Sequence, residues 1–138
     1  MSILFVGVAS LSGVDLVIRK TPTHDHLLQT NPGKLISVLG NLISNAIKYR
    51  RRPPSVSRSW VLVSCVRLHG QVRIDVVDNG IGIAVEDREL IFLDRTRVQH
   101  SGGPVDGHGI GLSSVRDTVL SMPRHQISMT SRLGIGSR

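Results

Sequence analysis

Apolar residues recur every three or four positions between Asn31 and Tyr49, which predicts an α-helix with one buried stripe. The stripe consists of Leu35, Val38, Leu39, Leu42, Ile43, Ala46 and Ile47. Asn31 suits the N-cap and Pro32 the first turn, where a missing N–H costs nothing. Asn41 and Asn45 are four residues apart, so they share a face beside the stripe. Two carboxamides there fit either a solvated helix edge or a binding site.

Runs rich in β-branched residues follow this helix at 60–68 and 71–78, and the pair predicts a β-hairpin that packs on the helix. Further strands are expected at 14–19 and 126–131, and further helices at 86–92 and 110–120. Loops are expected at 21–30, 50–59 and 94–109, the last of them as a mobile lid. This mixed order favours an α+β fold with helices on one face of a mostly antiparallel sheet.

The length of 138 residues predicts a single domain, and the net charge of +7 favours polyanionic ligands. Arg50–Arg52 is the only tight basic run, and no aromatic residues interleave with it, so a nucleic-acid partner is not expected. Cys65 is the single cysteine and is expected to be a buried free thiol. His24 and His26 flank Asp25, but without a third metal ligand they indicate a surface loop.

The apolar stretch 1–9 is too short to cross a bilayer and lacks basic residues before it. We therefore expect no membrane segment and a cytoplasmic domain.

Two glycine motifs carry candidate chemistry. Asp-x-Gly-x-Gly at 78–82 follows a predicted strand, where a carboxylate can accept from the amino group of a nucleotide base, although structural turns share this pattern. Gly-x-Gly-x-Gly-Leu at 107–112 opens a predicted helix, whose free N–H groups form an anion site. It is neither a P-loop nor a dinucleotide fingerprint, because no Lys-Ser/Thr follows and no strand precedes it.

Together, and in this order, the motifs resemble the catalytic ATP-binding domain of sensor histidine kinases, in the GHKL superfamily with gyrase-type and MutL-type ATPases. The segment 41–49 resembles the N box, and 78–83 and 107–112 resemble the two glycine boxes. The resemblance covers about 14–137 and implies a Bergerat fold, a two-layer α/β sandwich, in one domain spanning 1–138. The segment 131–137 is similar to the turn before the family's last strand, and that strand is expected to be missing.

The resemblance implies ATP and Mg²⁺ as ligands. Asn45 would ligate Mg²⁺, Asn41 and Lys48 would lie at the phosphates, and Tyr49 would form a wall near the base or ribose. Asp78 would accept from the adenine amino group. The other nucleotide-binding residues that it implies are Gly80, Gly82, Ile83, Gly107, His108, Gly109, Ile110, Gly111 and Leu112.

Asn41 stands where the ATPase members carry a glutamate that activates water, and a carboxamide cannot take a proton. The resemblance therefore implies a protein-histidine kinase, which transfers the γ-phosphate of ATP to a histidine. The family's dimerising helices with the phosphoacceptor histidine are not found in this sequence, nor is a sensor or receiver domain. The expected partner is a separate phosphoacceptor domain and, through it, a response regulator. Alone, the chain is expected to be monomeric and unable to autophosphorylate.

The family's F box resembles Ile91–Phe92 followed by Arg97, but Leu93 replaces the usual acid and Arg95 the usual second aromatic residue. These departures and the missing strand favour a first alternative, a degenerate nucleotide-binding module that acts in regulation or protein contact. The arginines around Arg50 leave a second alternative open, a basic domain that binds nucleic acid.

Overall fold

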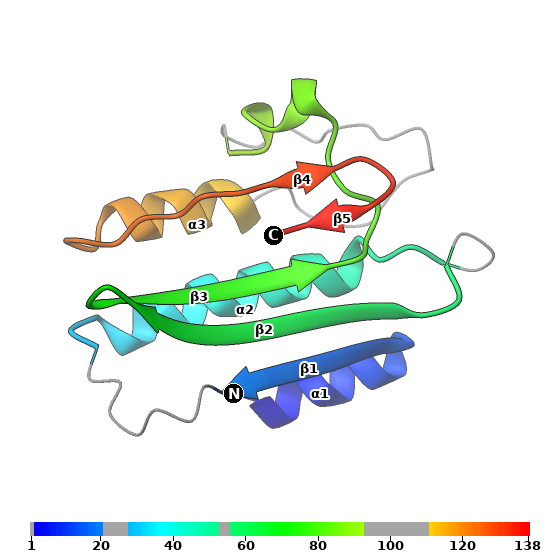
Figure 1. The fold of residues 1–138 in the computed structure, drawn as a ribbon, viewed down its shortest axis with the longest axis horizontal. Coiled ribbons are helices and arrows are strands. Elements are labelled where there is room, and N and C mark those ends of the chain that lie inside the picture. Colours follow the sequence, from blue (N-terminus) through cyan, green and yellow to red (C-terminus); the bar gives the residue numbers. More distant parts are fainter. Residues whose placement is uncertain (1, 21–27, 53–55, 93–110) are drawn as a thin grey trace.

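The computed structural model describes residues 2–20, 28–52, 56–92 and 111–138, which form two layers (Figure 1). One layer is a five-stranded sheet in the order β1-β2-β3-β5-β4. Its strands are β1 Val14–Lys20, β2 Ser59–Leu68, β3 Gln71–Asp78, β4 Ser131–Arg132 and β5 Gly136–Ser137. The other layer contains the helices α1 Ser2–Leu11, α2 Pro32–Lys48 and α3 Gly111–Leu120. Two 3-10 turns, Val85–Asp87 and Leu90–Phe92, complete the described elements.

Helix α2 forms where the apolar period predicts it. The Asn31 side chain accepts a hydrogen bond from the Lys34 N–H at 3.0 Å, and Pro32 occupies the first turn. The stripe divides into two sets of residues. Val38, Ile43, Ala46 and Ile47 are buried, whereas Leu35, Leu39 and Leu42 are only half-buried. The less buried set lines a cavity that the next subsection describes.

The hairpin is also confirmed. β2 and β3 pair antiparallel from Leu68↔Gln71 to Val61↔Asp78, and β1 pairs with β2 in parallel. His69 and Gly70 join the strands with positive φ values of 50° and 79°, which a two-residue hairpin turn requires. Because side chains alternate across a strand, Val61, Val63 and Val76 point together toward the helices.

The core has two parts. Ala9 of α1 packs with Val14, Ile43, Ala46, Ile47 and Val61, and Phe5, Leu16, Val63 and Val76 extend this group. Val38 packs with Val115, Val119 and Met122 between α2 and α3. Helix α2 thus joins both halves of the domain, so its register fixes the position of every residue on its exposed rim.

Four points of the sequence analysis need correction. No element was predicted for the opening stretch, yet 2–11 forms α1, which buries Ala9. The single helix expected at 86–92 is two separate 3-10 turns. The strand expected at 126–131 is wrong for 126–130, since β4 begins only at Ser131. Cys65 is a free thiol as expected, but it is half-buried rather than buried.

The final residues form β5, which pairs with β3 only at Asp78↔Ser137 and with β4 on its other side. Within the described ranges no strand pairs with the edge of β3 from Gln71 to Val77. None of the described helices has the length and apolarity that crossing a bilayer requires. The predicted lid and the histidines of 21–30 lie outside the described residues.

Candidate functional site

A cavity of about 1920 Å³ opens between α2, the hairpin and α3. It brings together residues from three segments that are far apart in the sequence. Of the residues predicted to bind nucleotide, Asn45, Tyr49, Asp78, Gly82, Ile83, Gly111 and Leu112 line it. Asn41 and Lys48 lie on α2 and Gly80 lies in the turn after β3, but none of the three is part of the described lining. Gly107, His108, Gly109 and Ile110 fall outside the described residues.

Asp78 is the last residue of β3, and its side chain faces the cavity. Burial raises the pKa of this carboxyl above its ordinary value of 3.8, while hydrogen bonds from the backbone N–H groups of Gly80 and Ser137 act in the opposite direction. The bond from Gly80 is 2.8 Å long and ends on Oδ1. One carboxylate oxygen is thus held by the following turn, and the group presents an acceptor at the cavity wall.

The turn after Asp78 is packed so closely that it requires glycine. A Cβ on Gly80 would lie 2.5 Å from the carbonyl oxygen of Tyr49. Gly82 has φ +67°, and a Cβ there would lie well under 3.0 Å from the carbonyl oxygen of Arg132. Between them the Ile81 N–H donates to the Tyr49 carbonyl at 3.0 Å. The turn therefore joins the end of α2 to the β4–β5 connection.

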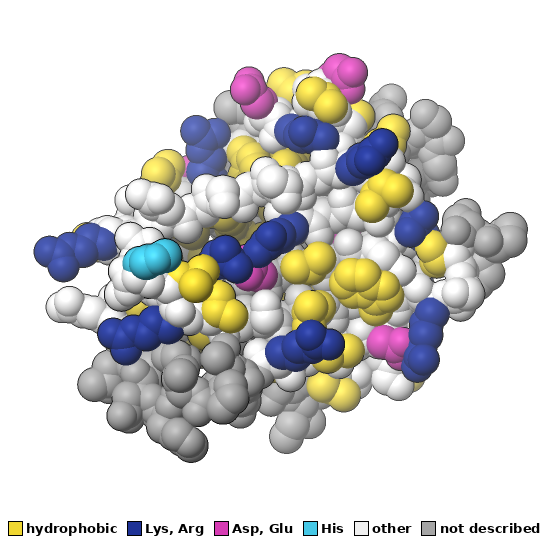
Figure 2. All heavy atoms as spheres, in the orientation of Figure 1, with side chains coloured by type: hydrophobic (Ala, Val, Ile, Leu, Met, Phe, Trp, Pro, Cys, Tyr) yellow, Lys and Arg dark blue, Asp and Glu magenta, His cyan; other side chains and the backbone are white. Residues whose placement is uncertain are grey.

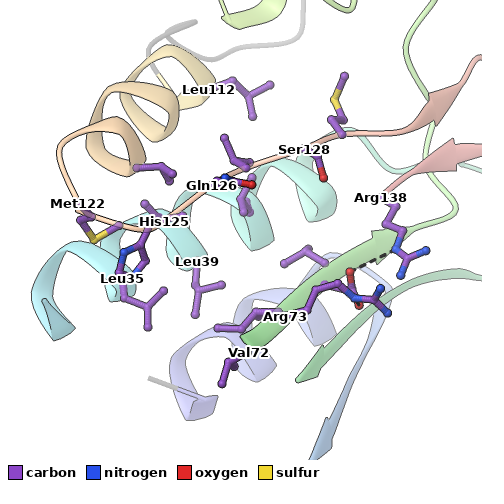
Figure 3. Close-up of a pocket in the computed structure, with 18 of the residues that line it drawn as sticks. Leu35, Leu39, Val72, Arg73, Leu112, Met122, His125, Gln126, Ser128 and Arg138 are labelled. Carbon is purple, nitrogen blue, oxygen red and sulfur yellow. Dashed lines mark hydrogen bonds and ion pairs between the residues drawn. The ribbon is translucent and has the colours of Figure 1, made fainter. Parts of the chain in front are cut away.

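Asn45 projects from α2 toward the start of α3. A Cβ on Gly111, the first residue of α3, would lie 3.2 Å from the Asn45 Nδ2 and 3.5 Å from its Oδ1. Glycine at position 111 thus leaves space between the Asn45 carboxamide and the N-terminus of α3. Backbone N–H groups at a helix N-terminus favour anions. Leu112 follows and points into the cavity (Figure 3).

Lys48 and Tyr49 close α2. The Lys48 ammonium lies 5.2 Å from the centre of the Tyr49 ring, within the range of a cation–π contact. The Tyr49 backbone N–H donates to the Asn45 carbonyl, which ends the helix. Tyr49 is 37% exposed and lines the cavity, so its ring is available as a wall.

The sequence analysis missed several residues that hold this site. Arg51 donates from Nε to the Asn79 carbonyl at 2.9 Å and from its guanidinium to the Gly134 carbonyl at 2.6 Å. Ser131 accepts a 2.8 Å hydrogen bond from the Ile83 N–H. In the sequence Arg51 is only one of three consecutive arginines and Ser131 only a polar residue before a glycine turn, and neither signal identifies the partner.

Arg51 also changes the interpretation of the basic run. Arg50 donates to the Ile47 carbonyl at the end of α2, so two of the three arginines are engaged with backbone carbonyls. On the face shown in Figure 2, basic side chains are spread over the surface rather than gathered in one patch. On this face the described residues thus offer no concentrated basic surface of the kind that nucleic acid binds.

We predict that Arg51→Ala lowers the free energy of unfolding by roughly 1–3 kcal/mol, because two carbonyl groups lose a charged donor at a half-exposed position. Arg52→Ala is the matched control. Arg52 is exposed, so its loss should change stability by no more than about 0.5 kcal/mol. Urea unfolding of both variants measures the difference, and equal midpoints would show that Arg51 does not hold the turn.

The residues present also bear on metal binding. No group of three His, Cys, Asp or Glu side chains that could hold a metal occurs among the described residues. Asn45 offers one carboxamide oxygen beside the space that Gly111 leaves open. A single neutral oxygen ligand fits a hard cation such as Mg²⁺ that is held mainly by phosphate oxygens and water.

Comparison with known proteins identifies the fold and the family. The family model described as histidine kinase-, DNA gyrase B- and HSP90-like ATPase matches residues 30–138. The catalytic domain of histidine kinase ThkA, in a nucleotide-free form, superposes with a TM-score of 0.75 at 22% identity, covering 98% of this chain and 81% of that one. The mycobacterial sensor histidine kinase MprB gives a TM-score of 0.64 at 22% identity, covering 86% of this chain and 72% of that one.

The sequence relatives are sensor proteins and sensory kinases. The adaptive-response sensory kinase SasA of Prochlorococcus marinus is 33% identical over 104 residues, which is 75% of this chain and 27% of SasA. The sensor protein GacS of Pseudomonas syringae is 34% identical over 125 residues, which is 90% of this chain and 13% of GacS. The chain thus spans about a quarter or less of the length of these relatives. By its matching segment and its fold, the chain belongs to the family of histidine kinase-, DNA gyrase B- and HSP90-like ATPases.

Proposed function

We propose that the chain is the ATP-binding catalytic domain of a two-component sensor histidine kinase, which transfers the γ-phosphate of ATP to a histidine on a separate phosphoacceptor domain. One observation carries the proposal. Asn45 of α2, Asp78 of β3 and Gly111 of α3 line the same cavity, although they come from distant parts of the sequence. The similarity to sensory kinases and to histidine kinase catalytic domains supports this reading.

Asp78 is the base-recognition residue in this proposal. Its carboxylate faces the cavity and would accept a hydrogen bond from the exocyclic amine of adenine. Gly80 and Gly82 keep the adjoining turn close-packed, and Ile83 offers an apolar surface to the base. Burial makes this recognition selective, since a buried acceptor left without its donor costs free energy.

Asn45 and the N-terminus of α3 form the phosphate end. The triphosphate would lie against the first N–H groups of α3, with Lys48 and Asn41 nearby on α2 and the glycine segment 107–110 completing the binding. Asn45 would hold Mg²⁺, which supplies neutralisation of the phosphate charge when bound. Tyr49 would flank the base or ribose.

Asn41 bears on the fate of the γ-phosphate. Hydrolysis requires a base to take a proton from water, and a carboxamide has no such capacity. Transfer to a histidine needs no base from this domain, because an imidazole nitrogen attacks directly. The domain's own contribution is positioning and charge stabilisation. The proposal includes a histidine phosphoacceptor domain and a response regulator as partners, and a cytoplasmic location.

Calorimetric titration of the chain with ATP, with and without Mg²⁺, tests the proposal. We expect one site whose affinity increases when Mg²⁺ is present. Addition of a separately produced histidine phosphoacceptor domain should then yield acid-labile, base-stable phosphate on that domain. A folded chain that binds no ATP would overturn the proposal.

Asn45→Ala should abolish the Mg²⁺ dependence. We expect its affinity for Mg-ATP to fall about tenfold, to the value that the unaltered chain shows in EDTA, because roughly 1.5 kcal/mol of metal-mediated binding is lost. Ser44→Ala is the matched control, since Ser44 directly precedes Asn45 on the same helix and is exposed. If Asn45→Ala keeps the full response to Mg²⁺, Asn45 is not the metal ligand.

A further inference from the structure

The open end of the β2–β3 ladder, next to Asp78, is irregular. Continuing the register one step beyond Val61↔Asp78 brings Trp60 opposite Asn79. In a hydrogen-bonded pair of an antiparallel ladder, each backbone N–H donates to the carbonyl of the opposite residue. The Asn79 N–H donates to the Trp60 carbonyl at 3.4 Å, as this pattern requires. The return bond differs, because the Trp60 N–H donates to the Asn79 side chain.

The Asn79 carboxamide takes the place of its own backbone carbonyl in the ladder. Its Oδ1 accepts from the Trp60 N–H at 2.9 Å, and its Nδ2 donates to the Arg58 carbonyl at 2.9 Å. These partners decide which end of the carboxamide is the oxygen, since a donor faces one end and an acceptor faces the other. The ladder thus continues past Asp78 through a side chain, while the backbone turns away from it.

The Asn79 carbonyl that leaves the ladder is held by Arg51. It accepts a 2.9 Å hydrogen bond from Arg51 Nε, and the same guanidinium donates to the Gly134 carbonyl. The backbone of Arg51 is held as well, because its carbonyl accepts a 2.6 Å hydrogen bond from the hydroxyl of Ser59, a buried residue. The direction of the Asn79 carbonyl is therefore fixed from both ends of Arg51.

This direction decides where the Gly80 N–H points. The Asn79 carbonyl and the Gly80 N–H belong to one planar trans peptide unit, so they point in opposite directions. With the carbonyl on Arg51, the Gly80 nitrogen lies 2.8 Å from Asp78 Oδ1 and donates to it. A carbonyl in the regular ladder position would point to β2 and would turn this N–H elsewhere. The orientation of the Asp78 carboxylate thus depends on the exchange at Asn79.

The exchange requires the particular side chain of asparagine. Asn79 is half-buried and uses the acceptor and the donor of its carboxamide at the same time. Aspartate has no donor and would place a carboxylate oxygen against the Arg58 carbonyl. Glutamine has both functions, but on a side chain that is longer by one methylene group. Position 79 therefore combines a short reach with two hydrogen-bonding functions.

We propose that Asn79 is a positioning residue for base recognition: its carboxamide releases the peptide between Asn79 and Gly80 from the ladder, and this peptide orients the Asp78 carboxylate. The inference rests on the proposed function, because Asn79 acts through the residue that would recognise the base. Asn79 is not part of the described lining of the cavity, so it is assigned no contact with the nucleotide. The end of the β2–β3 ladder thereby contributes to the preference for adenine.

A double-mutant cycle between positions 79 and 78 tests the proposal. In Asn79→Ala the backbone carbonyl should return to the Trp60 N–H, and the Gly80 N–H should leave the Asp78 carboxylate. The Ser137 N–H still donates to that carboxylate, so we expect a partial effect. ATP affinity should fall about three- to tenfold, and the preference for ATP over GTP should fall with it. Calorimetric titration measures both affinities.

The second half of the cycle separates positioning from a general structural role. In the Asp78→Asn background, Asn79→Ala should cost less than about twofold in ATP affinity, since the carboxylate through which it acts is gone. Equal losses in the two backgrounds would overturn the proposal. Gln71→Ala is the matched control. It removes an exposed carboxamide that also borders the cavity, but at the opposite end of β3, so neither affinity nor preference should change.

The Gly80 amide provides a measurement that needs no nucleotide. In the NMR spectrum of the unaltered chain, its proton should shift as the Asp78 carboxyl titrates, because the two groups share a hydrogen bond. Asn79→Ala should lose most of this shift, and an equal shift in both proteins would overturn the inference. If the unaltered chain binds no ATP, the proposed function fails, while this measurement still decides whether Asn79 orients the carboxylate.

Arg51→Ala covers the case in which Asn79→Ala does not fold. It releases the Asn79 carbonyl but leaves the carboxamide on the Trp60 N–H. We expect the preference for ATP over GTP to fall at least about twofold. Arg52→Ala, at the exposed neighbouring position, should leave the preference unchanged. An unchanged preference in Arg51→Ala would mean that the direction of this peptide does not control Asp78, and would overturn the proposal.

Discussion

Gly82→Ala should destabilise this domain by about 2–5 kcal/mol. An L-residue in the left-handed region costs roughly 1–2 kcal/mol, and Gly82 has φ +67°. Overpacking adds about 1–3 kcal/mol, because the new Cβ would lie well under 3.0 Å from the Arg132 carbonyl oxygen. That oxygen belongs to backbone and cannot swing aside. With a total stability of ~5–15 kcal/mol for an ordinary domain, much of the chain could unfold at 37 °C.

Gly134→Ala separates the two contributions to this loss. Gly134 has φ +75°, similar to that of Gly82, but a Cβ there would meet nothing within 4 Å. We therefore expect only the conformational cost, about 1–2 kcal/mol. Chemical denaturation of both variants measures the difference. If Gly82→Ala costs no more than Gly134→Ala, the close packing of the turn against the β4–β5 connection is wrong.

The elements that the sequence predicted well are those with a local signal. The helix at 32–48 has a 3.6-residue apolar period, an Asn31 cap and a proline in its first turn, and all three appear in the structure. The hairpin is encoded by β-branched residues around His69–Gly70. Such signals reside in a few neighbouring residues, so no tertiary information is needed to interpret them.

The errors occur where the outcome depends on distant partners. The stretch 2–11 is apolar on all sides, so it has no period to indicate which face packs against α2. Residues 126–130 alternate in exposure as a strand would, but β4 begins only at Ser131, where β5 supplies a partner. Strand formation requires a neighbour, and pattern alone does not provide one.

The candidate site, like the fold, could be predicted from the sequence only in part. The motif positions of Asn45, Asp78 and Gly111 could be found from the sequence, because each combines a polar or glycine residue with a predicted element boundary. Their convergence on one cavity and the bridging role of Arg51 could not, since both depend on how α2, β3 and the β4–β5 connection pack.

Asp78→Asn should weaken ATP binding by about 10- to 100-fold and leave the fold intact. A hydrogen bond to a charged acceptor is worth roughly 1.5–3 kcal/mol, which corresponds to this range. Asp75→Asn is the matched control. Asp75 lies on the same strand and also borders the cavity, but its carboxylate is engaged by Arg73 and Arg138, so ATP affinity should not change. Calorimetric titration of both variants provides the comparison.

The raised pKa of Asp78 predicts that Asp78→Asn weakens ATP binding without destabilising the fold. Burial raises the pKa in the folded state above 3.8. At pH values between the unfolded-state pKa and the folded-state pKa, the native chain therefore binds more protons than the unfolded chain. Stability from this group therefore falls as pH rises through that window, and the ionised carboxylate is unfavourable at neutral pH. Asn carries no charge, so the variant should melt at the same or a higher temperature at pH 7. This advantage should disappear below the unfolded-state pKa.

Nucleotide preference distinguishes recognition of the base from a general effect on the cavity. A carboxylate at position 78 accepts from the amino group of adenine and repels the carbonyl oxygen that guanine presents there, whereas a carboxamide can donate to that oxygen. Asp78→Asn should therefore reduce the preference for ATP over GTP as well as the affinity for ATP. An unchanged ratio of the two affinities would mean that Asp78 does not contact the base. Its buried charge would then have to be explained by the packing of the turn alone.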